Sequence, residues 1–398
     1  MDLLPKSEAS GRFVRLQRWM RDHEVDAVFV LQNVDLYYFA GTVQSGLLCL
    51  PPSGDPLYLV QKSVTRARIE SAWENVLPFP GFKKLPEWLA GEGFRELRRV
   101  GIETDVLPAI QYLRMRELFP EVEFVDASDG IRRIRMVKSA YEVDRVRRAA
   151  AMLRLAFERL PRWIRQGAAE IEIAAQLEGF LRGQGHPGIV RMRGFNSQIG
   201  YGTISGGASA SYPTHFPGPV GSVGLSPAAP GGAGEHRLAC GETLVVDIVG
   251  AYGGYIADKT RVFAVGEPPR DMAEAHRFAL DLNHEIELML KPGTLSSGIY
   301  QYALERVKSS PYANGFMGLG DSQVRFVGHG VGLELDELPV LAGGFDIPLE
   351  PGMTIAIEPK IFFPERGGVG IENTYLVTES GFENLTVFPE EITSIPEV

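Results

Sequence analysis

Thr243-Leu-Val-Val-Asp-Ile-Val-Gly-Ala-Tyr-Gly-Gly-Tyr-Ile-Ala-Asp-Lys-Thr-Arg-Val-Phe263 is the stretch from which the architecture is most readily inferred. Two β-rich segments flank a pair of glycines, a pattern that predicts a β-hairpin. If the turn centres between Tyr252 and Gly253, then Asp247 and Asp258 lie directly opposite each other on one face, where like charges destabilise a sheet. Burying a carboxylate without a partner is also costly. A bound cation would remove both penalties.

A second pair of acids shows the same pattern near the C-terminus. The segments 353–363 and 369–377 are predicted strands on either side of a turn that contains Pro and Gly, and each carries one glutamate, Glu358 or Glu372, among apolar neighbours. Because side chains alternate between the two faces of a strand, the even separation of these glutamates allows both to share a face. The two hairpins therefore pose the same problem of uncompensated charge.

Between the hairpins, His329 stands among glycines in Phe326-Val-Gly-His-Gly-Val-Gly-Leu333. Glycines allow another group to approach the backbone closely. Asp247 alone could equally be an edge or turn residue, since acids are rarely buried unpaired. Together, four carboxylates and one imidazole suit two divalent ions such as Mn²⁺, Co²⁺, Fe²⁺ or Zn²⁺ about 3.5–4 Å apart, an arrangement that activates water for hydrolysis.

Composition narrows the class of protein. The 398 residues are 44% hydrophobic and 23% charged, which is typical of a globular chain with two domains, and the net charge of -10 argues against nucleic acid as a partner. Small neutral or cationic partners fit this charge better. Cys49 and Cys240 are too few and too far apart for a disulfide framework or a Cys-based zinc site. The N-terminus lacks the apolar core of a signal peptide and no stretch is apolar enough to cross a membrane, so we expect a soluble cytoplasmic protein.

The order of predicted elements indicates an α/β (α+β) chain of two domains. Helix and strand signals alternate through the first third, and Ser139 and Glu142 form a capping box that predicts the start of a long helix. We therefore expect an N-terminal α/β domain over 1–132 and a catalytic domain over 133–398. The segment 200–240 is rich in Gly and Pro and is expected to be a lid or a binding loop.

Over nearly its whole length, the sequence resembles the pita-bread metallopeptidases, which include aminopeptidase P, prolidase and methionine aminopeptidase, with creatinase as a metal-free relative. The N-terminal part resembles the creatinase-type domain through Asn33-Val-Asp-Leu-Tyr-Tyr-Phe-Ala-Gly41. The motifs that match the pita-bread catalytic domain are Asp247-x10-Asp258 followed by Thr260-Arg261, then Gly328-His329-Gly-Val-Gly332, Glu358-Pro359 and Ile371-Glu372-Asn-Thr374. Jointly these motifs are highly specific.

The resemblance implies a role for each matching residue. Asp247 would chelate one metal ion, His329 and Glu358 would bind the other, and Asp258 and Glu372 would bridge both. A hydroxide held between the ions would attack the scissile carbonyl. Glu358 would be the catalytic proton shuttle, because it lies beside the nucleophile and the leaving nitrogen.

The sequence departs from the family pattern at three places that concern the substrate. Asp336 stands seven residues after His329, where aminopeptidase P and prolidase have a second, substrate-contacting His. Gly370 replaces an Arg often found just before the last glutamate. Relatives also have a histidine upstream of the first metal-binding Asp. In this sequence the nearest candidate for it is His215, and His236 is a poorer one. Asp336 and His215 are thus candidate catalytic-site residues, although an Asp capping the local backbone and an exposed loop His are equally open interpretations.

These observations leave one leading function and two alternatives. The leading function is a dinuclear metal-dependent exopeptidase of the aminopeptidase P or prolidase type, which hydrolyses Xaa-Pro bonds of peptides or dipeptides and forms a homodimer. The first alternative is a metal-dependent hydrolase or lyase of the same fold that acts on a small ectoine-, creatine- or sulfonium-like compound. The second is a non-catalytic binding module, which the presence of all five metal-ligand candidates disfavours.

Overall fold

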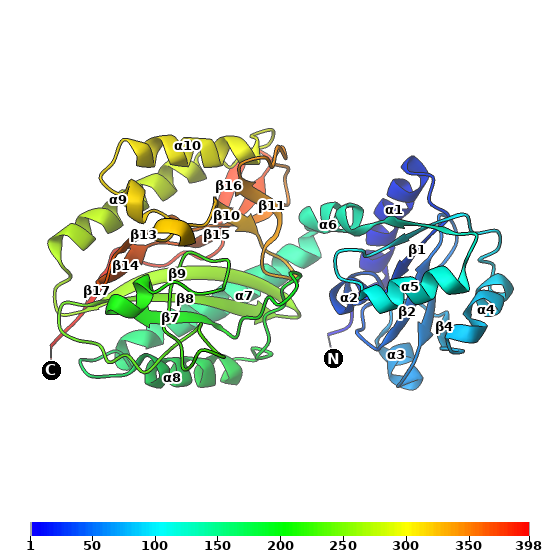
Figure 1. Ribbon diagram of the computed structural model, residues 1–398, viewed down its shortest axis with the longest axis horizontal. Helices are drawn as coiled ribbons and strands as arrows, with labels where there is room; N and C mark the ends of the chain where they lie inside the picture. Colours follow the sequence, from blue (N-terminus) through cyan, green and yellow to red (C-terminus); the bar gives the residue numbers. More distant parts are fainter. Residues whose placement is uncertain (1, 398) are drawn as a thin grey trace. The chain divides into compact units, whose positions relative to one another are not determined.

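The computed structural model describes residues 2–397 and divides the chain into two units, Met1–Arg135 and Met136–Val398. Both units combine helices with sheets, so the predicted α/β class is confirmed (Figure 1). Among residues 2–397, no helix is both long enough and apolar enough to cross a membrane.

The N-terminal unit is built on a six-stranded sheet in the order β4-β3-β2-β1-β5-β6. Its strands are β1 (Ala27–Val30), β2 (Gly46–Leu50), β3 (Leu57–Val60), β4 (Val76–Pro78), β5 (Arg99–Ile102) and β6 (Glu123–Asp126). The helices are α1 (Lys6–Asp22), α2 (Asn33–Ala40), α3 (Val64–Glu70), α4 (Leu85–Gly91), α5 (Ala109–Leu118) and α6 (Ser128–Met136). Every side chain of β1 is buried, because apolar residues of a central strand are covered on both faces.

A buried ion pair ties helices of the N-terminal unit together. Arg135 Nη1 donates to Asp35 Oδ1 over 2.7 Å, and both side chains are almost fully buried. We expect Arg135→Leu to lower the free energy of unfolding by about 3–5 kcal/mol, because it leaves a buried carboxylate without its cation. Urea denaturation followed by tryptophan fluorescence measures this loss. Arg133→Leu is the matched control on the same helix, because its partner Asp129 is exposed and such pairs contribute about 0–1 kcal/mol. Equal losses in the two variants would contradict the prediction.

The C-terminal unit has two main sheets and a two-stranded ribbon. The first sheet has the order β17-β9-β8-β7 and contains β7 (Gly202–Gly206), β8 (Thr243–Tyr252), β9 (Tyr255–Val265) and β17 (Thr393–Ile395). The second has the order β11-β10-β12-β15-β16 and contains β10 (Phe326–Gly330), β11 (Glu337–Ala342), β12 (Thr354–Ile357), β15 (Asn373–Thr378) and β16 (Gly381–Asn384). The ribbon pairs β13 (Lys360–Phe363) with β14 (Gly367–Gly370).

Four helices cover these sheets: α7 (Ala140–Arg159), α8 (Glu170–Gly183), α9 (Arg270–Glu287) and α10 (Ser296–Lys308). Helix α7 packs on β8 and β9, whereas α9 packs on the ribbon and α10 on β11 (Figure 1). The predicted capping box is confirmed: Ser139 Oγ accepts from the Glu142 amide, and the Glu142 carboxylate accepts from the Ser139 amide. The Gly/Pro-rich segment 200–240 begins with the edge strand β7, continues with a short 3₁₀ helix, Gly207–Ser211, and is otherwise irregular; its role as a lid or binding loop stays a prediction.

The predicted hairpin is present as β8 and β9, but its predicted register is wrong. The turn is formed by Gly253 and Gly254, both with positive φ, and such residues are favoured in tight two-residue hairpin loops. Asp247 therefore pairs with Thr260 instead of Asp258. Asp258 lies two residues away along the partner strand, so the two aspartates still share one face of the sheet.

Candidate metal centre

The two glutamates lie opposite each other where the second sheet gives way to the ribbon. Ile357 pairs with Asn373 and Lys360 pairs with Gly370, so this register places Glu358 across from Glu372. The two long strands expected here are each broken at the glutamate. Pro359 explains one break, because proline has no N–H for the ladder. The break frees both acids from regular strand geometry.

The two aspartates lie on the first sheet, next to the two glutamates. Thr260 of β9 forms a bridge with Glu372, and its Oγ1 donates to Glu372 Oε2 over 2.8 Å. The Asp258 amide donates to Thr374 Oγ1 over 2.9 Å, which fixes β9 against β15. Asp247, on the neighbouring strand β8, shares this face. The hairpin face and the two glutamates thus form one acidic cluster.

His329 completes the cluster from β10. Its Nδ1 lies 3.1 Å from the Gly330 carbonyl oxygen, which can only accept, so Nδ1 carries a proton. Its Nε2 faces the glutamates, 3.6 Å from Glu358 Oε1 and 3.9 Å from Glu372 Oε1. This orientation leaves the Nε2 lone pair of the neutral imidazole available as a ligand, the usual arrangement at metal-binding histidines.

The five predicted ligands fall into two overlapping groups. The Asp258 group consists of Asp258, His329 and Glu372, and the Asp247 group consists of Asp247, Glu358 and Glu372; within each group the ligand atoms lie within 4.8 Å of one another. The structure therefore brings all five side chains together. Glu358 lies near both groups, because it belongs to the Asp247 group and its Oε1 is also 3.6 Å from His329 Nε2, so the division of the ligands between two ions stays a prediction.

Burial makes the charges of this cluster costly. Burial, and then the charges of Glu372 and Asp247, raise the pKa of Asp258. Burial raises the pKa of Asp247 to about 6, although Lys360 opposes the shift. Burial alone would lower the pKa of His329, but the carboxylates around it outweigh that effect and raise it. The side chains are thus held in a site that favours a cation.

A residue that the sequence reasoning missed lies in the same cluster. The Nζ atom of Lys360 contacts Asp247 Oδ2 at 3.2 Å and Glu372 Oε2 at 2.9 Å, and it also donates to Glu358 Oε2. Burial opposes the charge of this ammonium, but the three carboxylates outweigh burial and raise its pKa. The sequence did contain a signal for it: Lys360 follows Glu358 by two residues on a predicted strand, and side chains two residues apart on a strand point to the same face.

The donor set fits a divalent cation even with Lys360 present. Four carboxylates face one ammonium, so negative charge remains uncompensated. Glu372 Oε1 is buried and accepts no hydrogen bond from any residue in the described range 2–397. This oxygen lies on the His329 side, 3.9 Å from His329 Nε2, whereas Lys360 contacts the other oxygen of the same carboxylate. Oxygen donors with one imidazole suit Mn²⁺, Fe²⁺, Co²⁺ and Zn²⁺.

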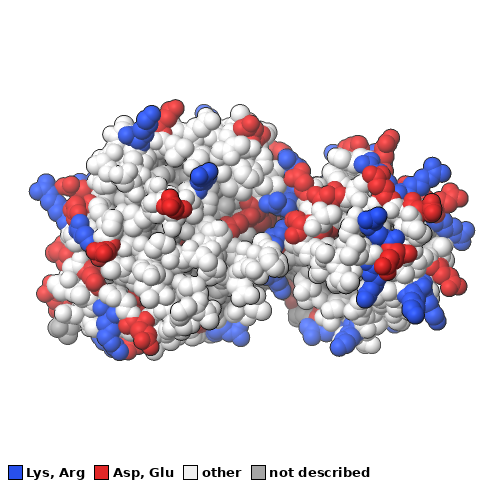
Figure 2. Space-filling view, in the orientation of Figure 1, with Lys and Arg blue, Asp and Glu red and all other residues white. Residues whose placement is uncertain are grey.

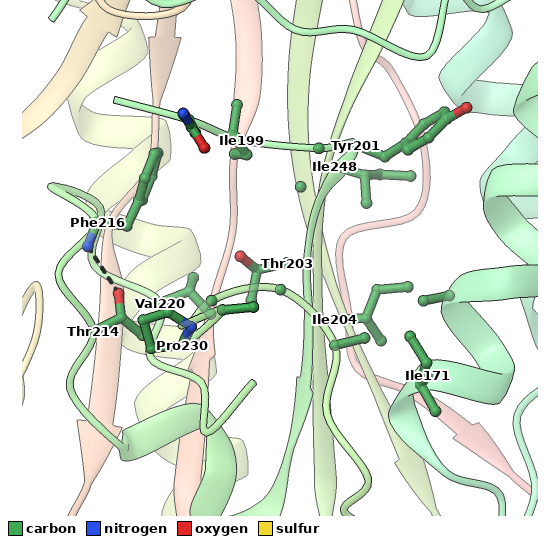
Figure 3. Close-up of a pocket in the computed structure, with 18 of the residues that line it drawn as sticks. Ile171, Ile199, Tyr201, Thr203, Ile204, Thr214, Phe216, Val220, Pro230 and Ile248 are labelled. Atoms are coloured by element: carbon green, nitrogen blue, oxygen red, sulfur yellow. Dashed lines mark hydrogen bonds between the residues drawn. The ribbon is translucent and has the colours of Figure 1, made fainter. Parts of the chain in front are cut away.

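Two adjoining spaces lie at the cluster. The acidic cavity, of about 30 Å³, is lined by Asp247, Asp258, His329, Asp336, Glu358 and Glu372 together with apolar residues. The loop pocket, of about 340 Å³, is lined largely by the segment 198–233 and shares Thr203 and Phe216 with the acidic cavity. Figure 3 shows apolar side chains around this pocket, and the Thr214 hydroxyl accepts from the Phe216 amide at 3.1 Å.

The two further candidate residues take different places. Asp336 lines the acidic cavity, with Oδ1 3.5 Å from His329 Nδ1 and a side chain 39% exposed. His215 is exposed and lines the loop pocket, but it is not among the residues that line the acidic cavity. Only Asp336 therefore lies beside the predicted ligands.

Comparison with known proteins agrees with this geometry. The sequence model of metallopeptidase family M24 matches residues 144–379, and that of the Creatinase/Prolidase N-terminal domain matches residues 12–137. The chain belongs to metallopeptidase family M24. The resemblance inferred from the motifs is thereby confirmed, and membership of this metallopeptidase family implies divalent metal ions.

Similar family members extend over nearly the whole chain. An Xaa-Pro dipeptidase of Pyrococcus furiosus is 28% identical over 96% of this chain and 99% of its own. The structure of an Xaa-Pro dipeptidase from Bacillus anthracis is 26% identical with a TM-score of 0.82, covering 97% of this chain and 99% of that chain. The prolidase of Pyrococcus horikoshii is 25% identical with a TM-score of 0.79, covering 96% and 99%. Both domains of these relatives are thus represented here.

Proposed function

We propose that this chain is a metal-dependent exopeptidase that hydrolyses the bond preceding proline in Xaa-Pro dipeptides or at the N-terminus of longer peptides. The observation that carries the proposal is the convergence of Asp247, Asp258, His329, Glu358 and Glu372 beside a pocket. Similarity to proteins named Xaa-Pro dipeptidase over almost the full length supports the choice of substrate. A homodimer and a cytoplasmic location stay predictions.

The five side chains offer ligands for up to two ions of Mn, Co, Zn or Fe. A divalent ion bound there would polarise the scissile carbonyl and lower the pKa of water. How many ions enter depends on Lys360, because its ammonium contacts every member of the Asp247 group.

Glu358 is positioned to move the proton. Its Oε2 is held by Lys360, while Oε1 faces His329, and the residue lines the acidic cavity. Burial raises the pKa of Glu358, although Lys360 opposes the shift, and a raised pKa suits a carboxylate that must accept a proton near neutral pH. Glu358 Oε1 takes the proton from the attacking water and returns it to the leaving nitrogen.

The surroundings suit a small, partly apolar substrate. The loop pocket combines apolar walls, among them Ile199, Phe216 and Val220, with a few polar groups such as the Thr203 hydroxyl (Figure 3). Such a lining is typical of small-molecule pockets. On the face drawn in Figure 2, charged side chains of the C-terminal unit lie mainly near its edges, and neither unit shows a continuous basic area. That face offers no platform for nucleic acid.

The decisive test uses metal-stripped protein reloaded with Mn²⁺, Co²⁺ or Zn²⁺ and a panel of an Xaa-Pro dipeptide, an Xaa-Pro-Xaa tripeptide and a non-proline dipeptide. We expect metal-dependent cleavage restricted to the substrates with proline, and the relative rates on dipeptide and tripeptide define the natural length. Metal binding without cleavage of any peptide would contradict the proposal and favour a small non-peptide amide as substrate.

Asp336 offers a separate prediction about substrate binding. Its exposed carboxylate beside the ligands is placed to bind the α-ammonium of the substrate, so we expect Asp336→Asn to raise KM by about 10–100-fold, the effect of losing a charged hydrogen bond. Asn is chosen because Asp336 has a φ of 62°, which Asn tolerates. Steady-state kinetics measure KM, and metal analysis should show unchanged metal content. Loss of metal instead would place Asp336 among the ligands.

A further inference from the structure

The ammonium of Lys360 lies among three of the carboxylates that are candidate metal ligands. Lys360 begins β13 directly after Glu358-Pro359, and its side chain is fully buried. Its Nζ contacts Asp247 at 3.2 Å, Glu372 at 2.9 Å and also Glu358. These three acids are the complete Asp247 group. An ammonium has three N–H donors and no acceptor, so three carboxylates satisfy it fully.

The backbone opposite Lys360 is shaped to admit this side chain. Gly370 pairs with Lys360 across the ribbon, and a Cβ at position 370 would lie 2.7 Å from Lys360 Cγ and 2.6 Å from the Pro359 carbonyl oxygen. The Cα of Lys360 would also lie 2.7 Å away, so a side chain at 370 would collide with the backbone of the partner strand as well as with the lysine stem. The glycine that stands in place of the expected Arg thus has a structural reason in the close approach of the partner strand.

The Asp258 group differs from the Asp247 group in its charge balance. No described Lys or Arg is paired with Asp258 in a salt bridge, and Glu372 presents Oε1 to this side without a hydrogen-bond partner in the range 2–397. His329 Nε2 faces the same space. The ammonium therefore lies on the Asp247 side of the cluster, and the two groups share Glu372, which Lys360 contacts through Oε2 only.

We propose that Lys360 replaces one of two metal ions, so that the centre binds a single divalent ion at Asp258, His329 and Glu372. This inference rests on the assignment of the five side chains in the proposed function. An ion in the Asp247 group would lie against the ammonium, and like charges repel strongly in a buried site. A second ion would also have to share Asp247, Glu358 and Glu372 with the ammonium that already contacts all three.

The test counts bound metal without using catalysis. Metal-stripped wild-type protein and Lys360→Met are dialysed to equilibrium against Mn²⁺, and Mn²⁺ per chain is measured together with the electron paramagnetic resonance spectrum. We expect one magnetically isolated Mn²⁺ in wild type and two spin-coupled ions in Lys360→Met. Lys360→Arg keeps the positive charge and should bind one. Lys291→Met, on an exposed lysine, is the matched control and should also bind one.

The outcomes separate this inference from the proposed function. Two tightly bound, coupled Mn²⁺ ions in wild type would overturn it, whether or not any variant folds. A folded Lys360→Met protein that still binds only one ion would overturn it as well. One ion in wild type and two in Lys360→Met, with no Xaa-Pro peptide cleaved, would support it and contradict only the proposed substrate. Absence of Mn²⁺ binding to every protein would overturn both.

Discussion

In the Glu358→Gln variant, we expect kcat for Xaa-Pro dipeptides to fall by about 10²–10⁴-fold, the usual contribution of a positioned general acid–base. Glutamine has nearly the same shape as glutamate but cannot carry a proton between water and the leaving nitrogen. The amide oxygen can still accept from Lys360, which holds the native side chain through Oε2. The local packing should therefore survive while turnover is lost.

Steady-state kinetics with saturating metal measure this effect, and circular dichroism checks the fold. Glu350→Gln is the matched control, because Glu350 is exposed and lies outside the acidic cavity, so its kcat should stay near wild type. Full activity of a folded Glu358→Gln protein would exclude Glu358 as the proton shuttle. The metal content of both proteins is measured in parallel, because a loss of ions would show that Glu358 acts as a ligand.

The sequence was sufficient to identify the residues of the candidate metal centre, but not the exact register of the strands that carry them. Charge in apolar strands is so unfavourable that Asp247, Asp258, Glu358 and Glu372 could be identified without any structure, and the structure brings them together with His329. The predicted turn centre was one residue too early, because the sequence Tyr252-Gly253-Gly254-Tyr255 allows more than one turn centre. The even offset that resulted kept both aspartates on one face.

Contacts between segments far apart in the chain could not be predicted from the sequence. The grouping of Glu358 with Asp247 depends on how the ribbon β13–β14 meets the first sheet, and that contact joins segments more than a hundred residues apart. The role of Gly370 was equally hidden, because a missing side chain has meaning only when its cross-strand neighbour is known. The pairing of Gly370 with Lys360 shows that the partner strand approaches too closely for a side chain at 370.

The second large effect is expected in Asp258→Asn, which should change metal binding and stability in opposite directions. Asp258 is buried, and its pKa is raised by burial and by neighbouring carboxylates, so its charge opposes folding when no ion is bound. The neutral amide removes that penalty, and the metal-free variant should unfold at a higher temperature than metal-free wild type. Its affinity for Mn²⁺ should fall by more than about 100-fold, since even outer hydrogen-bond partners of ligands contribute about 10–100-fold.

Calorimetric titration with Mn²⁺ and thermal melts with and without Mn²⁺ test both parts of this prediction. Because an ion that binds only the folded state raises stability in proportion to the logarithm of its concentration over Kd, wild type should gain stability with Mn²⁺ and Asp258→Asn should gain little. Asp281→Asn is the control, since Asp281 is exposed on α9 and should alter neither quantity. Equal Mn²⁺ affinity in Asp258→Asn and wild type would remove Asp258 from the ligands. A metal-free variant less stable than wild type would show instead that the carboxylate contributes to the fold without an ion.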